Sequence, residues 1–182
     1  MIQLPETAPG FDDPLGLLAA CHGRIEAQCE LLLRLQAHLG KAGNDAQASQ
    51  AARRIRQYFT TAGRHHHEDE EQNFFPMLAA YARAQQRTEI LNLMDALRRQ
   101  HAKLDAHWDA LAPQLERIIA GEGIAPGSLP VAEFIQANRE HIQQENTLIL
   151  PFAQEVLSAE DLRQLGSVMA ARRGQSVSGD KP

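Results

Sequence analysis

Cysteine and aromatic residues are scarce in this chain, and both shortages exclude classes of protein. The 182 residues include two Cys, one Trp, two Tyr and six Phe. Cys21 and Cys29 are eight residues apart on one predicted helix, and a helix rises about 1.5 Å per residue, so the two thiols cannot form a disulfide. Two reduced thiols fit the cytoplasm, and a disulfide-stabilised secreted fold is excluded.

Excess positive charge and long apolar runs are absent as well. The net charge is −5 and the sequence pI is near 5.9, which, with so few aromatics, gives no basis for binding nucleic acid. No apolar run approaches the roughly 18 residues of a membrane span. Residues 1–10 have neither a basic start nor an apolar segment, so they do not resemble a secretory signal. We therefore expect a cytoplasmic protein that binds neither nucleic acid nor membranes.

No segment shows the alternating pattern of a β-strand, and the chain instead predicts long amphipathic helices. Capping residues, glycines and prolines divide it into four long helices and one short one, at about residues 14–39, 45–85, 88–120, 131–157 and 158–173. Pro76 and Pro113 are predicted kinks, and 121–130 is a Gly- and Pro-rich loop. The expected fold is all-α: an up-down-up-down four-helix bundle with a short fifth C-terminal helix. We expect an arm at 1–12, the bundle at 13–173 and a disordered tail at 174–182.

A repeated motif is the most informative feature of the sequence. His66-x3-Glu70-x4-Phe75-Pro76 recurs 75 residues later as His141-x3-Glu145-x4-Leu150-Pro151. The i, i+4 spacing places each His and Glu on one face of a helix. A lone histidine precedes each motif at a similar separation: His22 lies 44 residues before His66, and His101 lies 40 residues before His141. The chain therefore consists of two similar helical hairpins.

These histidines interrupt otherwise apolar stripes that face the predicted core. The fourth long helix, for example, has the stripe Phe134, Asn138, His141, Glu145, Leu148, Phe152. One histidine on such a stripe is more often a hydrogen-bonded core residue than a ligand. Two buried glutamates are different, because desolvating their charge costs several kcal/mol unless it is matched. Bound cations would supply the matching charge, so the set predicts a metal centre.

Four imidazoles and two carboxylates without thiolate suit iron, manganese or zinc. The donor number suits two ions better than one. Glu70 and Glu145 could bridge them, with His22 and His66 on one ion and His101 and His141 on the other. Ferritin-like bundles carry Glu-x-x-His motifs, and this chain has none.

Three neighbouring residues leave alternatives open. His67 and Glu71 have the same i, i+4 spacing as His66 and Glu70, so a one-residue shift in register is the main rival assignment. On the preferred register, His65 and His67 lie about 100° from His66 and should face solvent or a helix flank. Asp105 is one turn beyond His101 and could be a seventh ligand or could hydrogen-bond a ligand imidazole.

The combined pattern resembles the hemerythrin-like, or HHE cation-binding, family of non-haem di-iron four-helix bundles. The resemblance rests on Asp13-Pro14-Leu15 before His22, on both His-x3-Glu-x4-[Phe/Leu]-Pro segments and on Gln-His-Ala-Lys-Leu around His101. It implies that iron is bound by six residues: His22, His66, Glu70, His101, His141 and Glu145.

The sequence departs from the oxygen-carrying members at two positions. Those proteins have a second histidine where this chain has Asp105, and an aspartate where it has Asn146, so Glu145 takes the bridging role one residue earlier. The resemblance implies two iron ions with a bridging oxo or hydroxo group, zinc or manganese being possible substitutes. The expected function is binding or sensing of oxygen or nitric oxide. The alternatives are a di-iron oxidoreductase, an iron-donating repair protein, or a metal-free interaction bundle with packed histidines.

Overall fold

The computed structural model describes residues 9–125 and 127–175, and this part of the chain contains helices and no strand. The all-α prediction is confirmed. The helical elements follow in the order α1 Pro14–Ala42, α2 Ala46–Thr60, α3 Ala62–Asp69, the π-helical turn η1 Glu70–Phe74, α4 Phe75–Ala84, α5 Thr88–Ile119, α6 Val131–Gln144, η2 Glu145–Ile149, α7 Leu150–Val156 and α8 Ala159–Arg172. Most of the predicted N-terminal arm and C-terminal tail, residues 1–8 and 176–182, lies outside the described residues.

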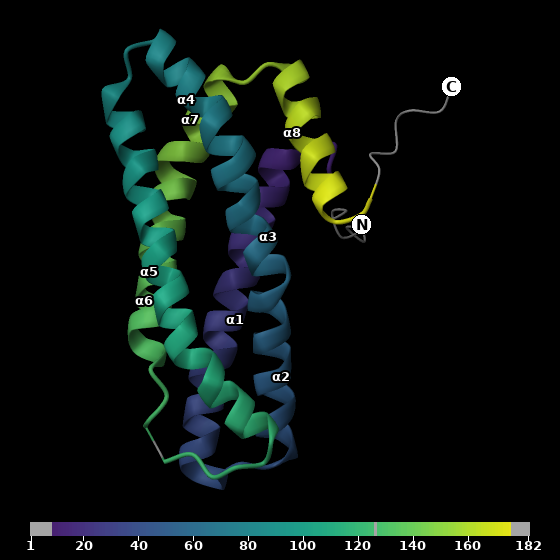
Figure 1. The fold of residues 1–182 in the computed structure, drawn as a ribbon, viewed down its shortest axis with the longest axis vertical. Helices are drawn as coiled ribbons and strands as arrows, with labels where there is room; N and C mark the ends of the chain where they lie inside the picture. Colours follow the sequence, from purple (N-terminus) through teal and green to yellow (C-terminus); the bar gives the residue numbers. More distant parts are fainter. Residues whose placement is uncertain (1–8, 126, 176–182) are drawn as a thin grey trace, which may run out of the picture.

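The helices run beside one another along the long axis of the molecule (Figure 1). α1 packs against α2 and α6, and α5 packs against the same two helices. The loop between α5 and α6 lies at the lower end of the view, and the turn between α4 and α5 lies at the upper end. α8 packs against α1 and α3 and lies outside the group formed by α1, α2, α5 and α6.

Helix ends follow the capping chemistry of the sequence. Asp13 accepts a hydrogen bond from the backbone N–H of Gly16, with Pro14 at the first helical position of α1. α1 continues past Gly40 and ends at Gly43, whose φ of 74° is accessible to glycine at little cost. Ser158 and Asp161 form a reciprocal capping box at the start of α8.

The single helix expected at 45–85 is divided in the structure into α2, α3, η1 and α4. It breaks at Thr61, where φ is −125° and ψ is −87°. The hydroxyls of Thr60 and Thr61 bond back to the carbonyl groups of Arg56 and Gln57, a local alternative that weakens a helix. α3 therefore starts anew one turn before His66.

A π-turn follows each His-x3-Glu pair, where the sequence analysis expected at most a proline kink. Glu70 begins η1 and Glu145 begins η2. In both turns the carbonyl of the glutamate accepts an i+5 hydrogen bond, from the N–H of Phe75 and of Leu150. Proline is the next residue each time, and it lacks an N–H and clashes with the i−4 carbonyl of a regular helix. The wider turn accommodates the proline, and such turns are frequent at functional sites.

The π-turn also corrects one predicted core position. Leu148 was assigned to the buried stripe, but it is 49% exposed, while Ile149 is fully buried. The extra residue in η2 moves the inward-facing position from 148 to 149, because the α-helical period no longer holds across a π-turn.

Two apolar clusters fill the interior, and a polar layer separates them. Along α1, Leu18 belongs to the first cluster and Ile25 to the second, with buried His22 between them. α5 repeats this order with Leu97, His101 and Leu111. The fold thus holds a layer of ionisable side chains midway along its length. Within the described residues, no helix is long and apolar enough to cross a membrane.

Candidate metal centre

The six predicted site residues meet in the polar layer. Six elements supply one each: His22 from α1, His66 from α3, Glu70 from η1, His101 from α5, His141 from α6 and Glu145 from η2. None of the six is more than 2% exposed. The fold therefore brings together six predicted residues that lie in distant parts of the chain.

These residues form two overlapping groups that could each hold a metal ion. The potential ligand atoms lie within 4.8 Å of one another in each group. The first group is His22, His66, Glu70 and Glu145; the second is Glu70, His101, His141 and Glu145. Both glutamates belong to both groups, which is the arrangement a pair of bridging carboxylates requires.

The duplicated sequence is matched by duplicated distances. Nε2 of His66 lies 3.3 Å from Oε1 of Glu70, and Nε2 of His141 lies 3.3 Å from Oε1 of Glu145. The lone histidines cross to the other motif: His22 Nε2 lies 3.0 Å from Glu145 Oε2, and His101 Nε2 lies 3.4 Å from Glu70 Oε2. Each motif thus supplies a carboxylate to the lone histidine of the other half.

A second set of contacts orients the lone histidines, and it crosses between the halves in the same way. His22 Nδ1 lies 2.7 Å from Oδ1 of Asn146, and His101 Nδ1 lies 2.7 Å from Oε1 of Glu71. Each partner directly follows a motif glutamate. An Nδ1–H that donates to an oxygen leaves the Nε2 lone pair directed at the site, as a neutral imidazole ligand needs.

His141 is oriented similarly, with Nδ1 3.0 Å from Oε1 of Gln100. These orienting residues were not identified from the sequence. Glu71 appeared only as a rival ligand, yet its side chain is 43% exposed and contacts the outer nitrogen of His101. The sequence does contain a sign of this role, because a side chain with an acceptor oxygen directly follows the glutamate in both motifs, as Glu71 and as Asn146.

The carboxylates strongly perturb the histidines. Burial lowers the pKa of His22, but contacts with Glu145 and Glu70 outweigh it and raise the pKa to about 10. Burial also lowers the pKa of His101, but contacts with Glu70 and Glu71 outweigh burial and raise this pKa to about 9. His66 is dominated by burial, which lowers its pKa to about 4. Neighbouring imidazoles of opposite pKa shift show how strongly charge is concentrated in this layer.

The donor atoms themselves fit a metal. Buried atoms without a hydrogen-bond partner among the described residues include His22 Nε2, both ring nitrogens of His66, Glu70 Oε2 and both carboxylate oxygens of Glu145. Some of these atoms still lie within ion-pair distance of one another, as His22 Nε2 and Glu145 Oε2 do at 3.0 Å. Nδ1 of His66 has neither kind of partner among the described residues, and an unpaired buried polar atom costs about 1–3 kcal/mol. Nε2 atoms of His101 and His141 are 3.0 Å apart. Imidazole nitrogens and carboxylate oxygens that converge on one place in this way form a suitable binding site for a metal ion that does not need thiolate ligands.

His67 lies on a flank of its helix, one of the two positions expected for it, and this flank of α3 faces α5. Its ring stacks on that of His101, with centroids 4.1 Å apart and planes at 19°. Its potential ligand atom lies within 4.8 Å of those of His101 and His141, in a group that includes neither glutamate. Glu71, the carboxylate of the rival register, belongs to none of the potential metal groups among the described residues, whereas Glu70 belongs to two.

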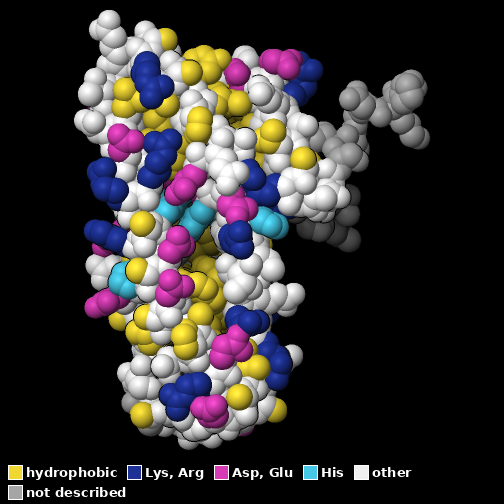
Figure 2. All heavy atoms as spheres, in the orientation of Figure 1, with side chains coloured by type: hydrophobic (Ala, Val, Ile, Leu, Met, Phe, Trp, Pro, Cys, Tyr) yellow, Lys and Arg dark blue, Asp and Glu magenta, His cyan; other side chains and the backbone are white. Residues whose placement is uncertain are grey.

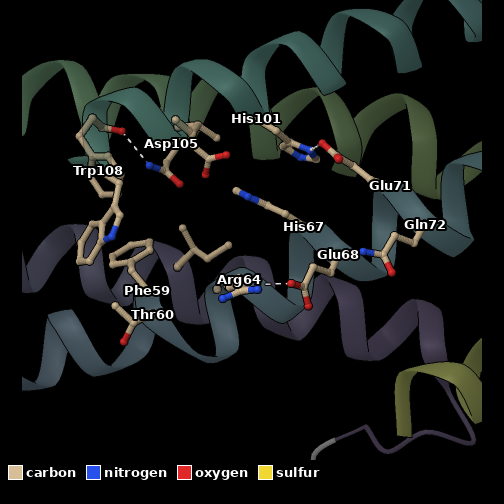
Figure 3. A pocket seen from close by; sticks show the side chains of 15 residues that line it. Phe59, Thr60, Arg64, His67, Glu68, Glu71, Gln72, His101, Asp105 and Trp108 are labelled. Atoms are coloured by element: carbon tan, nitrogen blue, oxygen red, sulfur yellow. Dashed lines mark hydrogen bonds and ion pairs between the residues drawn. The ribbon is translucent and has the colours of Figure 1, made fainter. Parts of the chain in front are cut away.

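Asp105, the possible seventh ligand, is exposed and belongs to none of the potential metal groups. It instead lines a cavity of about 400 Å³ beside the polar layer, together with His67 and His101. In Figure 3 the His67 side chain points from α3 into this cavity, toward α5. Figure 2 shows histidine side chains reaching the surface midway along the molecule, with apolar side chains in the furrow below them.

α8 secures the segment that carries the site. Asp69, next to Glu70, is fully buried. Its carboxylate lies 2.9 Å from Nε of Arg172 and 2.8 Å from Nη2 of Arg173. Burial raises the pKa of Asp69, and Arg173 and Arg172 oppose that rise. The pairing ties the start of η1 to the C-terminal helix.

Comparison with known proteins agrees with this centre. The family described as the hemerythrin HHE cation binding domain matches residues 13–153. The chain therefore belongs to the hemerythrin HHE family, whose name itself refers to cation binding. One relative, an uncharacterized protein of Haemophilus influenzae (strain ATCC 51907 / DSM 11121 / KW20 / Rd), is 34% identical over 169 residues, which cover 93% of this chain and 95% of the relative. The resemblance inferred from the motifs is confirmed.

Proposed function

We propose that this protein is a non-haem di-iron protein that binds or senses oxygen or nitric oxide. One observation carries the proposal: two potential metal groups of four residues share Glu70 and Glu145. Two shared carboxylates favour a pair of ions over separate single sites, because each negative charge then offsets the repulsion between two cations.

In this proposal His22 and His66 hold one iron ion, and His101 and His141 hold the other. Glu70 and Glu145 bridge them, and the iron pair shares an oxo or hydroxo group. Zinc or manganese could substitute, since mixed nitrogen and oxygen donors suit them as well. Four helical rows in an up-down-up-down bundle would present these ligands from four sides. Iron, when bound, would supply reversible redox chemistry and affinity for diatomic ligands.

The chain's own residues would bind, orient and protect. Asn146, Glu71 and Gln100 would fix the imidazole rings through Nδ1. The apolar clusters above and below the layer would exclude bulk water. We place this function in the cytoplasm, since Cys21 and Cys29 are free thiols.

A spectroscopic experiment separates binding from catalysis. The iron-loaded, reduced protein is exposed to an excess of oxygen or nitric oxide, with and without an added chemical reductant, and both its absorption spectrum and the gas concentration are followed. A binding or sensing protein gives a stable spectral change that reverses when the gas is removed. Continuous consumption of the gas with a returning spectrum would contradict the proposal and indicate turnover.

The second candidate is a di-iron oxidoreductase or an iron-donating repair protein. The cavity of about 400 Å³ beside His101 favours it, because that volume lies in the range of small-molecule pockets and exceeds the need of a diatomic ligand. Loss of iron to an apo-acceptor protein, or turnover in the gas experiment, would support this candidate.

A further inference from the structure

His67 lies beside both the cavity and the second metal group, Glu70, His101, His141 and Glu145. Its ring stacks on His101 and lies edge-on to His141, with centroids 6.0 Å apart and planes at 71°. His67 and His101 both line the cavity, whose other lining residues include apolar Phe59 and Trp108 and charged Asp105. The potential ligand atoms of His67, His101 and His141 lie within 4.8 Å of one another. A small molecule that moves from the cavity to the ligand atoms of His101 and His141 therefore meets the His67 ring (Figure 3).

The polar atoms of His67 have no evident structural use. Among the described residues, neither of its ring nitrogens has a hydrogen-bond or ion-pair partner, whereas His22, His101 and His141 each have an oxygen at Nδ1. A histidine that packs only for shape could be replaced by an apolar ring without cost. Here the polar ring faces the site instead.

His67 belongs to a third group of residues that could hold a metal ion, with His101 and His141. This group contains neither of the shared glutamates, and the group of Glu70, His101, His141 and Glu145 does not include His67. His67 thus lies beside the second metal group, on the side of its histidines, and away from the shared carboxylates. This is the position of a residue that would meet an incoming ligand.

We propose that His67 is the gate of the second metal group and the residue that hydrogen-bonds a small anionic or diatomic ligand bound there. The ligand enters through the cavity lined by Phe59, Asp105 and Trp108. It displaces the His67 ring from its stack on His101, and a ring N–H of His67 then donates to the bound ligand. This inference rests on the proposed metal centre and assigns a role to a histidine outside the six predicted ligands.

The test uses the iron-loaded protein and azide as the small anionic probe. Azide binding is followed by absorption in stopped-flow mixing for wild type, His67→Ala, His67→Gln and the matched control His65→Ala, with iron content measured in parallel. His67→Ala should keep its iron, bind azide faster because the gate is gone, and release it about ten-fold faster because one hydrogen bond is lost. His67→Gln keeps an N–H donor and should release azide more slowly than His67→Ala does.

A second pair of variants tests the route. Asp105 lines the cavity and Asp109, one turn further along α5, does not; both are exposed, so substitution should not affect folding. Asp105→Trp should fill the cavity and slow azide association, and Asp109→Trp should behave as wild type.

The results for these variants test the role of His67, the route through the cavity and the proposed metal centre separately. Loss of iron from His67→Ala would overturn the proposal and make His67 a metal ligand. Azide kinetics identical to wild type in both His67 variants would overturn the gate and the hydrogen bond. Equal rates in Asp105→Trp and Asp109→Trp would overturn the route through the cavity. A wild-type protein that holds no iron would instead contradict the proposed function.

Discussion

The Nδ1 atom of His22 lies 2.7 Å from Oδ1 of Asn146, across 124 residues of sequence. The bond joins the first helix to the residue that follows the second motif glutamate. His101 and Glu71 repeat it in the other direction at the same distance. The two halves of the molecule are thus interlocked: the residue after each glutamate orients the lone histidine of the opposite half.

The Asn146 contact should tune metal affinity. Asn146→Ala leaves His22 in place but removes the acceptor that fixes its ring, and loss of such an orienting partner typically weakens metal binding about 10–100-fold. Competition with a chelator of known affinity measures the change. Thr147→Ala is the control, because the Thr147 hydroxyl bonds to the carbonyl of Gln143 in its own helix. Equal affinities for the two variants would mean that the Asn146 contact has no role in orientation.

The register of the first motif can be tested by comparing neighbours. His66→Ala should lose at least one ion per chain, since His66 is fully buried, and His65→Ala should lose none. Glu70→Ala should empty more of the site than Glu71→Ala, because Glu70 belongs to both metal groups and Glu71 to neither. Elemental analysis of the purified variants decides the point. The register is wrong by one residue if Glu71→Ala empties the site and Glu70→Ala retains it.

The pH dependence of stability should differ between the metal-free and the metal-loaded protein. The pKa of His22 is raised from 6.5 to about 10 and that of His101 to about 9 in the metal-free fold. A raised pKa contributes stability that is complete below pH 6.5 and is lost as pH rises through the folded value. The melting temperature of the metal-free protein should therefore fall between pH 6.5 and about 10.

Metal binding needs neutral imidazoles, so metal affinity grows over the same pH range. The gap in melting temperature between the two forms should widen as pH rises. Below pH 4.5 both forms should lose stability: burial raises the pKa of Glu70, but contacts with the surrounding imidazoles, those of His101 and His22 among them, outweigh it and hold this pKa well below 4.5, and the stability that this contributes disappears on acidification. Thermal melts of both forms at pH values below 4.5 and from pH 6.5 to about 10 measure both changes. A metal-free protein whose melting temperature is constant above pH 6.5 would contradict the charge pairing of His22 and His101.

Arg172 and Arg173, at the C-terminal end of α8, should contribute strongly to stability because they pair with the buried carboxylate of Asp69. Removing both partners of the buried Asp69 leaves its carboxylate unmatched, which costs about 3–5 kcal/mol. Arg172→Ala combined with Arg173→Ala should lower the free energy of unfolding by about that amount in urea titrations. Arg163→Ala removes an exposed pair with Glu160 and should change stability by less than about 1 kcal/mol. A double variant as stable as Arg163→Ala would show that Asp69 is neutral in the fold.

The sequence predicted which histidines and glutamates lie buried in the polar layer, because the residues on one face of a helix can be counted from its period. His22 lies one turn after Leu18 and about one turn before Ile25, and all three are buried. Position along a regular helix is a local property, so periodicity captures it. The same reasoning placed all six candidate ligands in the centre of the fold.

Periodicity failed where the helix was irregular or where a contact came from elsewhere in the chain. The π-turn at Glu145 placed Leu148 outside and Ile149 inside, and a 3.6-residue period does not describe such a turn. The stack of His67 on His101 depends on how closely α3 approaches α5. The partners of Nδ1 on His22 and His101 come from the opposite half of the chain, and no local pattern encodes that distance.

Metal stoichiometry tests the central claim most directly. The purified protein is reduced and reconstituted with ferrous iron without oxygen, freed of unbound metal and analysed for iron per chain. The shared use of Glu70 and Glu145 by two groups of donors predicts close to two ions per chain. An iron content of one ion or none would contradict the di-iron account, and none would favour a bundle whose histidines only pack.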